Sequence, residues 1–346
     1  MNRILFAVCL SFLAACGGSN AGGESAASAP AATGLINGAG ATFPFPIYSK
    51  WFEEYRKLHP NVRINYQSIG SGGGIRQLQA GTVDFGASDS PMTDDQIAQM
   101  GVKPLHFPTV LGAVVPTYNL PGASQELKFT PEALAEIFLG TVTKWNDPAI
   151  AKPNPGVALP AGDIVVIHRS DGSGTTFVWT DYLSKVNNAW GARAGAGTSI
   201  NWPVGLGAKG NEGVAGLVKQ TPNSIGYVEL VYAIQNHMSY GAVRNAAGSF
   251  VRADLAGVTA AAASTPMPAD FRVSIVNSPG KDAYPISSFT WLLVPSRIPD
   301  ASKRTALTSF LKWMLADGQG MATALGYAPL PQEVVSKELG AIAQIQ

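Results

Sequence analysis

Residues 35–67 read LINGAGATFPFPIYSKWFEEYRKLHPNVRINYQ, and this stretch decides the fold class. It begins with a strand-type run (35–39) and ends with a second one (62–67). Between them, Ile47 and Trp51 are spaced as on one face of a helix. A strand, a helix and a second strand in this order form a βαβ unit, whose two strands are parallel.

The same alternation of strand-type and helix-type patterns continues towards the C-terminus. Strand-type runs recur along the chain, at residues 83–87, 105–110, 112–118, 164–168, 225–228 and 289–294. Helical spacing of apolar residues occurs at 132–139 and 302–315, whereas the small-residue stretch 256–268 is predicted to be a loop. We therefore predict an α/β fold with mixed, mostly parallel sheets flanked by helices, in which the chain crosses into a second domain and returns.

The N-terminus has the pattern of an exported protein. Arg3 precedes an apolar run at residues 4–13 that is too short to span a bilayer, which indicates a signal peptide (1–15). The run ends in LAAC, which resembles the lipobox of bacterial lipoproteins, so we expect a lipid on Cys16. The alternative is ordinary cleavage with an incidental cysteine. The Gly-, Ser- and Ala-rich segment that follows (16–34) is predicted to be a flexible tether.

Charge and cysteine content exclude several classes of protein. The chain of 346 residues has 24 Lys and Arg, so removal of Arg3 with the signal leaves 23, equal to the 23 Asp and Glu. A nucleic-acid binder normally has a basic excess, so nucleic acid is not an expected partner. Cys9 lies inside the signal, so the mature chain keeps one cysteine and no disulfide. Stability must come from burial, for which 46% hydrophobic residues suffice.

Four segments place glycines or small polar residues where a strand leads into a helix. They are GAGATF (38–43), GSGGG (70–74), ASD (87–89) and RSDGSGT (169–175). Free backbone N–H groups and the helix dipole attract anions at such junctions. Each segment alone is more often ordinary turn chemistry, but their recurrence indicates an oxyanion site.

Known catalytic and metal-binding patterns are not matched. The nucleotide-binding pattern G-x-x-x-x-G-K-[ST] is absent, and Asp171 breaks the G-x-S-x-G pattern around Ser173. A serine hydrolase or phosphatase that uses Ser173 stays as the second hypothesis, although its nearest histidine, His168, is expected to point away. The four histidines show no metal-ligand spacing, so we expect no metal, no cofactor and no enzymatic activity.

Six motifs in the same order and spacing resemble the phosphate-binding proteins of the phosphate-specific ABC transporter. They are GAGATFP (38–44), GSGGG (70–74), VDFGASD (83–89), KWNDP (144–148), RSDGSGT (169–175) and SIGYVE (224–229). The resemblance implies a two-domain periplasmic-binding-protein clamp with the ion in the interdomain cleft. It also implies that the C-terminal segment completes the first domain, so we predict domain I at 35–109 and 284–346 and domain II at 110–283.

Carried over motif by motif, the resemblance implies eight phosphate-binding residues. They are Thr42, Phe43, Ser71, Asp89, Arg169, Ser173, Gly174 and Thr175. Phe43 would contribute only its backbone N–H, and Arg169 would hold two phosphate oxygens with its planar guanidinium. Asp171 would orient Arg169 through an ion pair, with a solvated turn aspartate as the alternative. Gly72 stands where relatives often have serine.

Asp89 carries the expected selectivity. A carboxylate beside a dianion is repulsive unless the anion donates a proton to it, and phosphate keeps one proton at neutral pH, whereas sulfate has none. An unpaired buried polar group costs on the order of 1–3 kcal/mol, so this contact favours phosphate over sulfate. The alternative is a helix-capping role for Asp89 in the turn SDSP.

The predicted function is therefore high-affinity binding of inorganic phosphate outside the cytoplasmic membrane and its delivery to the permease subunits of an ABC importer. The protein would be a monomer, held through Cys16 on the periplasmic or cell-surface side of a membrane. A phosphate sensor or adhesin on the same scaffold has the same sequence pattern.

Overall fold

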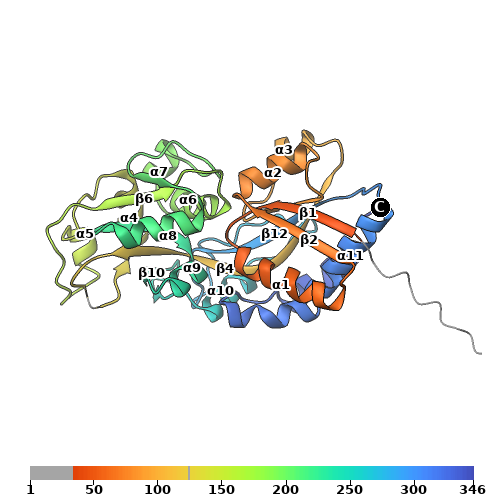
Figure 1. Cartoon of the computed structure of the whole chain (residues 1–346). Coiled ribbons are helices and arrows are strands. Elements are labelled where there is room, and N and C mark those ends of the chain that lie inside the picture. Colours follow the sequence, from red (N-terminus) through yellow and green to blue (C-terminus); the bar gives the residue numbers. More distant parts are fainter. Residues whose placement is uncertain (1–33, 124) are drawn as a thin grey trace, which may run out of the picture. The chain divides into compact units, whose positions relative to one another are not determined.

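The fold is given by a computed structural model, which describes residues 34–123 and 125–346 (Figure 1). The predicted signal peptide (1–15), Cys16 and nearly all of the predicted tether (16–34) lie outside these residues. Within the described ranges, no helix is both long and apolar enough to cross a membrane.

The predicted βαβ unit is confirmed at the start of the described chain. It consists of β1 (Gly34–Gly40), α1 (Phe45–Leu58) and β2 (Val62–Ser68), and the two strands are parallel, with Gly38 opposite Tyr66. The apolar face of α1 that indicated the helix is buried. This burial holds α1 against the sheet and fixes the loop that precedes it.

Within the described residues, the main sheet has nine strands, eight of them in the order β2-β1-β3-β12-β4-β8-β6-β7, with β9 paired to β4. Its further strands are β3 (Phe85–Ser88), β4 (Pro104–Asn119), β6 (Val165–Arg169), β7 (Leu206–Ala208), β8 (Ser224–Glu229), β9 (Ser239–Tyr240) and β12 (Ser287–Pro295). The predicted mixed character is confirmed. Parallel pairing is confined to the two ends of the sheet, because β12 and β4 pair antiparallel with their neighbours between them.

Strand β4 connects the two parallel ends of the sheet. Its residues 104–113 pair with β12, and its residues 114–119 pair with β8. The two strand runs expected at 105–110 and 112–118 are thus one continuous strand. Gly112 does not interrupt it: a Cβ there would come within 2.6 Å of the Phe43 ring, so a residue without a side chain allows close packing.

The expectation of a loop at 256–268 is wrong for its first half. Helix α10 (Leu255–Ala263) occupies it, and the Asp254 side chain accepts a hydrogen bond from the Gly257 N–H at 2.7 Å. Alanine has the highest helix propensity, and an aspartate cap satisfies one of the free N–H groups at the start of a helix. The run of small residues therefore favours a helix once the cap is recognised.

Helices flank both ends of the sheet (Figure 1). Besides α1 and α10, the helices near β1, β3 and β12 are α2 (Ser71–Gln79), α3 (Asp94–Ala98), α11 (Ala301–Leu315) and α12 (Gln332–Ile342). The helices at the other end are α4 (Pro131–Leu139), α5 (Pro148–Ala151), α6 (Gly174–Val186), α7 (Asn188–Arg193), α8 (Gly210–Gln220) and α9 (Leu230–Gln235). A small second sheet joins β5 (Lys128–Phe129), β10 (Ala242–Arg244) and β11 (Phe250–Val251).

The C-terminal segment packs on the first strands of the chain. β12 pairs with β3, and α11 contacts β1. The chain therefore leaves this end of the sheet through β4 and returns to it with β12. The domain boundaries expected at 109/110 and 283/284 stay predictions.

Candidate functional site

The structure brings together residues from all four junction segments. Thr42 follows β1, Ser71 begins α2, Asp89 follows β3, and Arg169 and Thr175 lie at the end of β6 and the start of α6. The carboxyl ends of the parallel strands β1 and β3 meet at one edge of the sheet, which places the loops after them near each other. Strand β6 runs in the opposite direction, and hydrogen bonds between the α2 and α6 segments join its loop to the others. All five side chains are at most 3% exposed. We call these five residues the buried cluster.

The loops of the cluster contact each other directly. The Ser71 hydroxyl oxygen accepts hydrogen bonds from the Gly174 N–H at 3.0 Å and the Asp89 N–H at 3.2 Å. The Gly72 N–H donates to the Gly172 carbonyl at 2.9 Å. A Cβ on Gly174 would come within 2.5 Å of the Ser71 oxygen, so this close approach needs glycine. The segments around α2 and α6 are thus closed on one another.

Four buried residues in and next to the cluster have a backbone N–H group without an acceptor in the described part of the chain. These residues are Thr42, Phe43, Ser71 and Thr175, which lie at or just before the starts of α1, α2 and α6. An unsatisfied buried donor costs about 1–3 kcal/mol. Four such donors at helix starts make a site that an oxyanion can satisfy.

Arg169 is the cation of the cluster, and Asp171 holds its guanidinium. Nε and Nη2 donate to the two carboxylate oxygens of Asp171 at 2.7 and 2.5 Å, and Nη1 reaches the Thr175 hydroxyl at 3.5 Å. Burial acts to raise the pKa of Asp171, but the hydrogen bonds and charge of Arg169 hold it below its usual value. Arginine has five N–H bonds, so two remain for a ligand.

Asp89 lies in a different environment, since its carboxylate has no arginine bonded to it among the described residues. It is 1% exposed, and Oδ1 accepts a hydrogen bond from the Thr290 hydroxyl at 2.8 Å. Burial raises the pKa of Asp89 to about 7, although the Thr290 hydrogen bond, the charge of Arg169 and Ser71 each lower it. This carboxylate can therefore share a proton near neutral pH.

The helix-capping alternative for Asp89 does not match the geometry. Helix α3 is capped by Thr93, whose hydroxyl accepts from the Gln96 N–H at 3.2 Å while the Gln96 side chain accepts from the Thr93 N–H at 3.0 Å. This reciprocal pair is a capping box. Asp89 therefore does not cap α3, and its carboxylate bonds Thr290 instead.

Ser173 has the geometry of a helix cap. Its hydroxyl oxygen accepts from the Thr176 N–H at 3.0 Å, and its own N–H donates to the Thr198 carbonyl at 2.8 Å. His168 lies elsewhere, with its ring stacked on Trp202 at 4.6 Å. Within residues 34–123 and 125–346 no histidine is bonded to Ser173, so the arrangement that a serine nucleophile needs is absent there.

The Phe43 side chain packs in the core. Its ring is fully buried, 6.3 Å from the ring of Tyr327, and the Tyr327 hydroxyl donates to the Phe43 carbonyl at 2.7 Å. The backbone N–H is therefore the group that this residue presents to the cluster.

Two residues that contact the cluster were missed by the sequence interpretation. Thr290 bonds Asp89, and Asn211 bonds the Thr42 hydroxyl through its side-chain amide at 2.8 Å. The sequence contains only a weak indication of a functional role for each of these two residues. Thr290 is a polar residue inside an apolar strand run, and Asn211 follows a glycine at the start of α8. Neither lies near the junction motifs in sequence.

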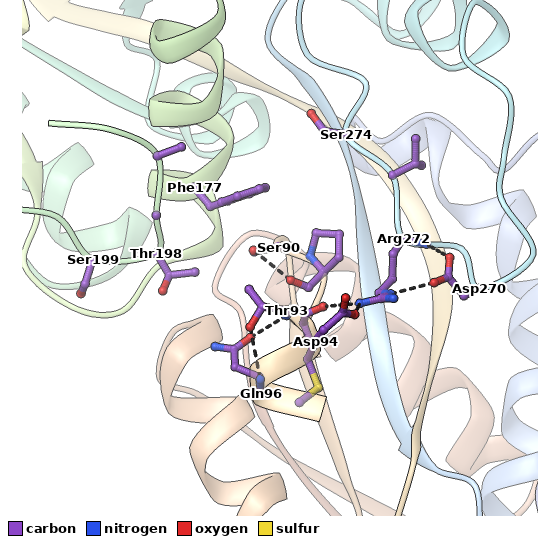
Figure 2. A pocket seen from close by; sticks show the side chains of 15 residues that line it. Ser90, Thr93, Asp94, Gln96, Phe177, Thr198, Ser199, Asp270, Arg272 and Ser274 are labelled. Atoms are coloured by element: carbon purple, nitrogen blue, oxygen red, sulfur yellow. Dashed lines mark hydrogen bonds and ion pairs between the residues drawn. The ribbon is translucent and has the colours of Figure 1, made fainter. Parts of the chain in front are cut away.

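A pocket of about 620 Å³ lies beside the cluster (Figure 2). Ser90 in its wall follows Asp89 in sequence, and Thr198 bonds the backbone of Ser173. Its cation, Arg272, is bonded to Asp94 at 2.7 Å, to Asp270 at 2.8 Å and to the Met92 carbonyl at 3.0 Å. Two carboxylates neutralise Arg272, whereas one carboxylate faces Arg169, so the buried cluster is the better anion site.

Comparison with known proteins gives one consistent family. A family model described as a PBP superfamily domain matches residues 25–318. The chain is 47% identical over 305 residues to phosphate-binding protein PstS of Xylella fastidiosa, which covers 87% of this chain and 83% of that protein. It is 46% identical over 305 residues to phosphate-binding protein PstS of Pasteurella multocida, with 87% and 88% covered.

Solved structures show the same fold. A high-affinity periplasmic phosphate-binding protein bound with phosphate has a TM-score of 0.73 at 22% identity, covering 89% of this chain and 93% of that one. A phosphate-binding protein from Stenotrophomonas maltophilia has a TM-score of 0.68 at 17% identity, covering 89% and 94%. The predicted two-domain periplasmic-binding-protein fold is confirmed, as is the prediction of a binding protein rather than an enzyme. The chain belongs to the PstS family of phosphate-binding proteins, within the PBP superfamily.

Proposed function

We propose that the protein binds inorganic phosphate in the buried cluster and delivers it to the permease subunits of an ABC-type importer. The observation that carries this proposal is the pairing of one proton-sharing carboxylate, Asp89, with a set of hydrogen-bond donors that have no acceptor in the described chain. The names of the relatives at 46% and 47% identity support the ligand.

The donors suit an ion with several unprotonated oxygens. Four backbone N–H groups, from Thr42, Phe43, Ser71 and Thr175, lie at or just before helix starts and have no acceptor in the described chain. The two remaining N–H bonds of Arg169 add a charge-assisted contact, which is about twice as strong as a neutral one. A dianion can give up its hydration shell here because hydrogen bonds from these donors replace those from water.

Asp89 supplies the selectivity in this proposal. Monohydrogen phosphate donates its proton to the carboxylate, whereas sulfate would place an unprotonated oxygen against it. Leaving both groups unpaired and charged costs at least about 1–3 kcal/mol, or roughly tenfold to a hundredfold in affinity. Gly174 allows the close approach of the Ser71 hydroxyl, which accepts from the Asp89 N–H and so holds this acceptor residue near the donors.

The proposed site of action is outside the cytoplasmic membrane. A solved structure of the same fold is named as a periplasmic phosphate-binding protein. We propose that Cys16 anchors the protein to a membrane through a lipid and that the protein acts as a monomer. Transfer of the Cys16→Ala variant from the membrane fraction to the medium or periplasm would test the anchor.

Calorimetry of the signal-free protein with phosphate, arsenate, sulfate and molybdate tests the function. We expect saturable, tight binding of phosphate and binding of sulfate at least about tenfold weaker. Tight binding of sulfate or molybdate with no response to phosphate would contradict the assignment. Turnover of a chromogenic phosphate ester that is lost in Ser173→Ala would support the hydrolase hypothesis instead.

A further inference from the structure

Asn211 connects two hydroxyl groups of the buried cluster. It is the second residue of α8 and is fully buried. Its side-chain Nδ2 donates to the Thr42 hydroxyl oxygen at 2.8 Å and to the Thr175 hydroxyl oxygen at 3.2 Å. Its backbone N–H also donates to the Thr42 oxygen at 3.3 Å.

The orientation of the Asn211 amide is set by a fourth contact. Oδ1 accepts a hydrogen bond from the Glu229 N–H at 3.0 Å. A backbone N–H can only donate, so the carbonyl side of the amide must face Glu229 and the NH₂ side must face the two threonines. Both hydroxyl oxygens are therefore acceptors towards Asn211.

Each hydroxyl group has two lone pairs and one proton, and the lone pairs are already used. The Thr42 oxygen accepts twice from Asn211, and the Thr175 oxygen accepts from Asn211 and from Arg169 Nη1 at 3.5 Å. Neither proton has an acceptor in the part of the chain that the structure describes. Towards any further partner, both hydroxyls can act only as donors.

We propose that Asn211 is a positioning residue that fixes the Thr42 and Thr175 hydroxyls as donors, which requires unprotonated ligand oxygens at both and leaves Asp89 as the place for the ligand's proton. This proposal rests on the proposed function. Asn211 itself need not touch the ligand. It fixes the Thr42 and Thr175 hydroxyls as donors, and these two groups, from loops that follow different strands of the sheet, are the ones that contact the ligand.

Asp89 offers the ligand a hydrogen-bond acceptor, whereas Thr42 and Thr175 offer donors. Thr290 donates to Oδ1, and in its ionised form the carboxylate has only acceptor sites left for a ligand. Fixed donors at Thr42 and Thr175 together with a fixed acceptor at Asp89 define one orientation of a singly protonated oxyanion. Without Asn211 the two hydroxyls could rotate and accept a proton from the ligand, so the distinction between protonated and unprotonated oxygens would weaken.

A double-mutant cycle tests the positioning role. Calorimetry at pH 8 should show that Asn211→Ala lowers phosphate affinity about 30-fold, since two oriented donors are lost. In a Thr42→Val and Thr175→Val background there is no hydroxyl to orient, so the same substitution should cost less than about 3-fold. An equal loss in both backgrounds would overturn the proposal, because a purely structural role acts in each.

Asn211→Asp provides a second, isosteric variant that can fold even where alanine leaves the Glu229 N–H unpaired. Its carboxylate accepts from Glu229 but also from the two hydroxyls, which turns their protons away from the ligand. We expect a larger loss of affinity than in Asn211→Ala, and a smaller one in the double-valine background, where only the added charge remains. Affinity equal to that of the unchanged protein would contradict the proposal. Failure of the unchanged protein to bind phosphate would contradict the proposed function itself.

Discussion

Asp89 belongs to the buried cluster and Asp171 bonds Arg169 of that cluster, but the two carboxylates differ in what surrounds them. Asp171 is held by two hydrogen bonds from Arg169, and its pKa is lowered. Asp89 has no such partner among the described residues, and burial raises its pKa to about 7. One carboxylate is therefore kept charged to orient a cation, and the other is kept ready to share a proton. The comparison teaches that environment, rather than residue type, assigns the two roles.

Removal of Arg169 should have the largest effect on binding. Arg169→Ala leaves Asp171 charged and without its partner, and it takes away the charge-assisted contacts to the ligand. We expect phosphate affinity to fall by on the order of 10⁴-fold in calorimetry. Arg244→Ala is the matched control, since Arg244 forms an exposed ion pair with Glu132 at 2.8 Å. A similar loss in both variants would show that the effect is not specific to the cluster.

Asp89→Asn should stabilise the ligand-free protein at high pH. The pKa of Asp89 rises from 3.8 to about 7 on folding, so the folded state binds the proton more tightly than the unfolded state. The associated stability is fully present below about pH 4 and is lost as pH rises through 7, by about 4 kcal/mol. Urea unfolding at pH 4, 6 and 8 should show that the advantage of asparagine grows with pH. An advantage that is the same at all three values would contradict the raised pKa.

Asp171→Asn should act in the opposite direction. The lowered pKa of Asp171 means that its contribution to stability is present above its unfolded pKa and is lost as pH falls through the folded pKa. At pH 8 the variant should be less stable by about 1–2 kcal/mol and should bind phosphate about 10- to 30-fold more weakly, because Arg169 is no longer oriented. Asp163→Asn, which breaks the exposed pair with Lys144, is the control and should change neither. An unchanged phosphate affinity in Asp171→Asn would show that Asp171 does not contribute to phosphate binding.

The sequence predicted the junction loops better than the contacts between them. The βαβ unit and the four glycine- and serine-rich segments are local patterns, so Thr42, Ser71 and Arg169 could be placed at strand ends before the structure was known. Thr290 and Asn211 reach the cluster from strands and helices far away in sequence, and such contacts depend on tertiary packing. The helix at Leu255–Ala263 was missed because its small residues were interpreted as a loop without its Asp254 cap.

The central claim is that Asp89 makes the site selective for an oxyanion that carries a proton. The direct test is the ratio of phosphate to sulfate affinity at pH 8, measured by calorimetry in the unchanged protein and in Asp89→Asn. Asparagine carries no charge and can donate to sulfate, so we expect the ratio to fall by at least about tenfold, with weaker phosphate binding and stronger sulfate binding. A ratio that stays the same in the variant would contradict this account.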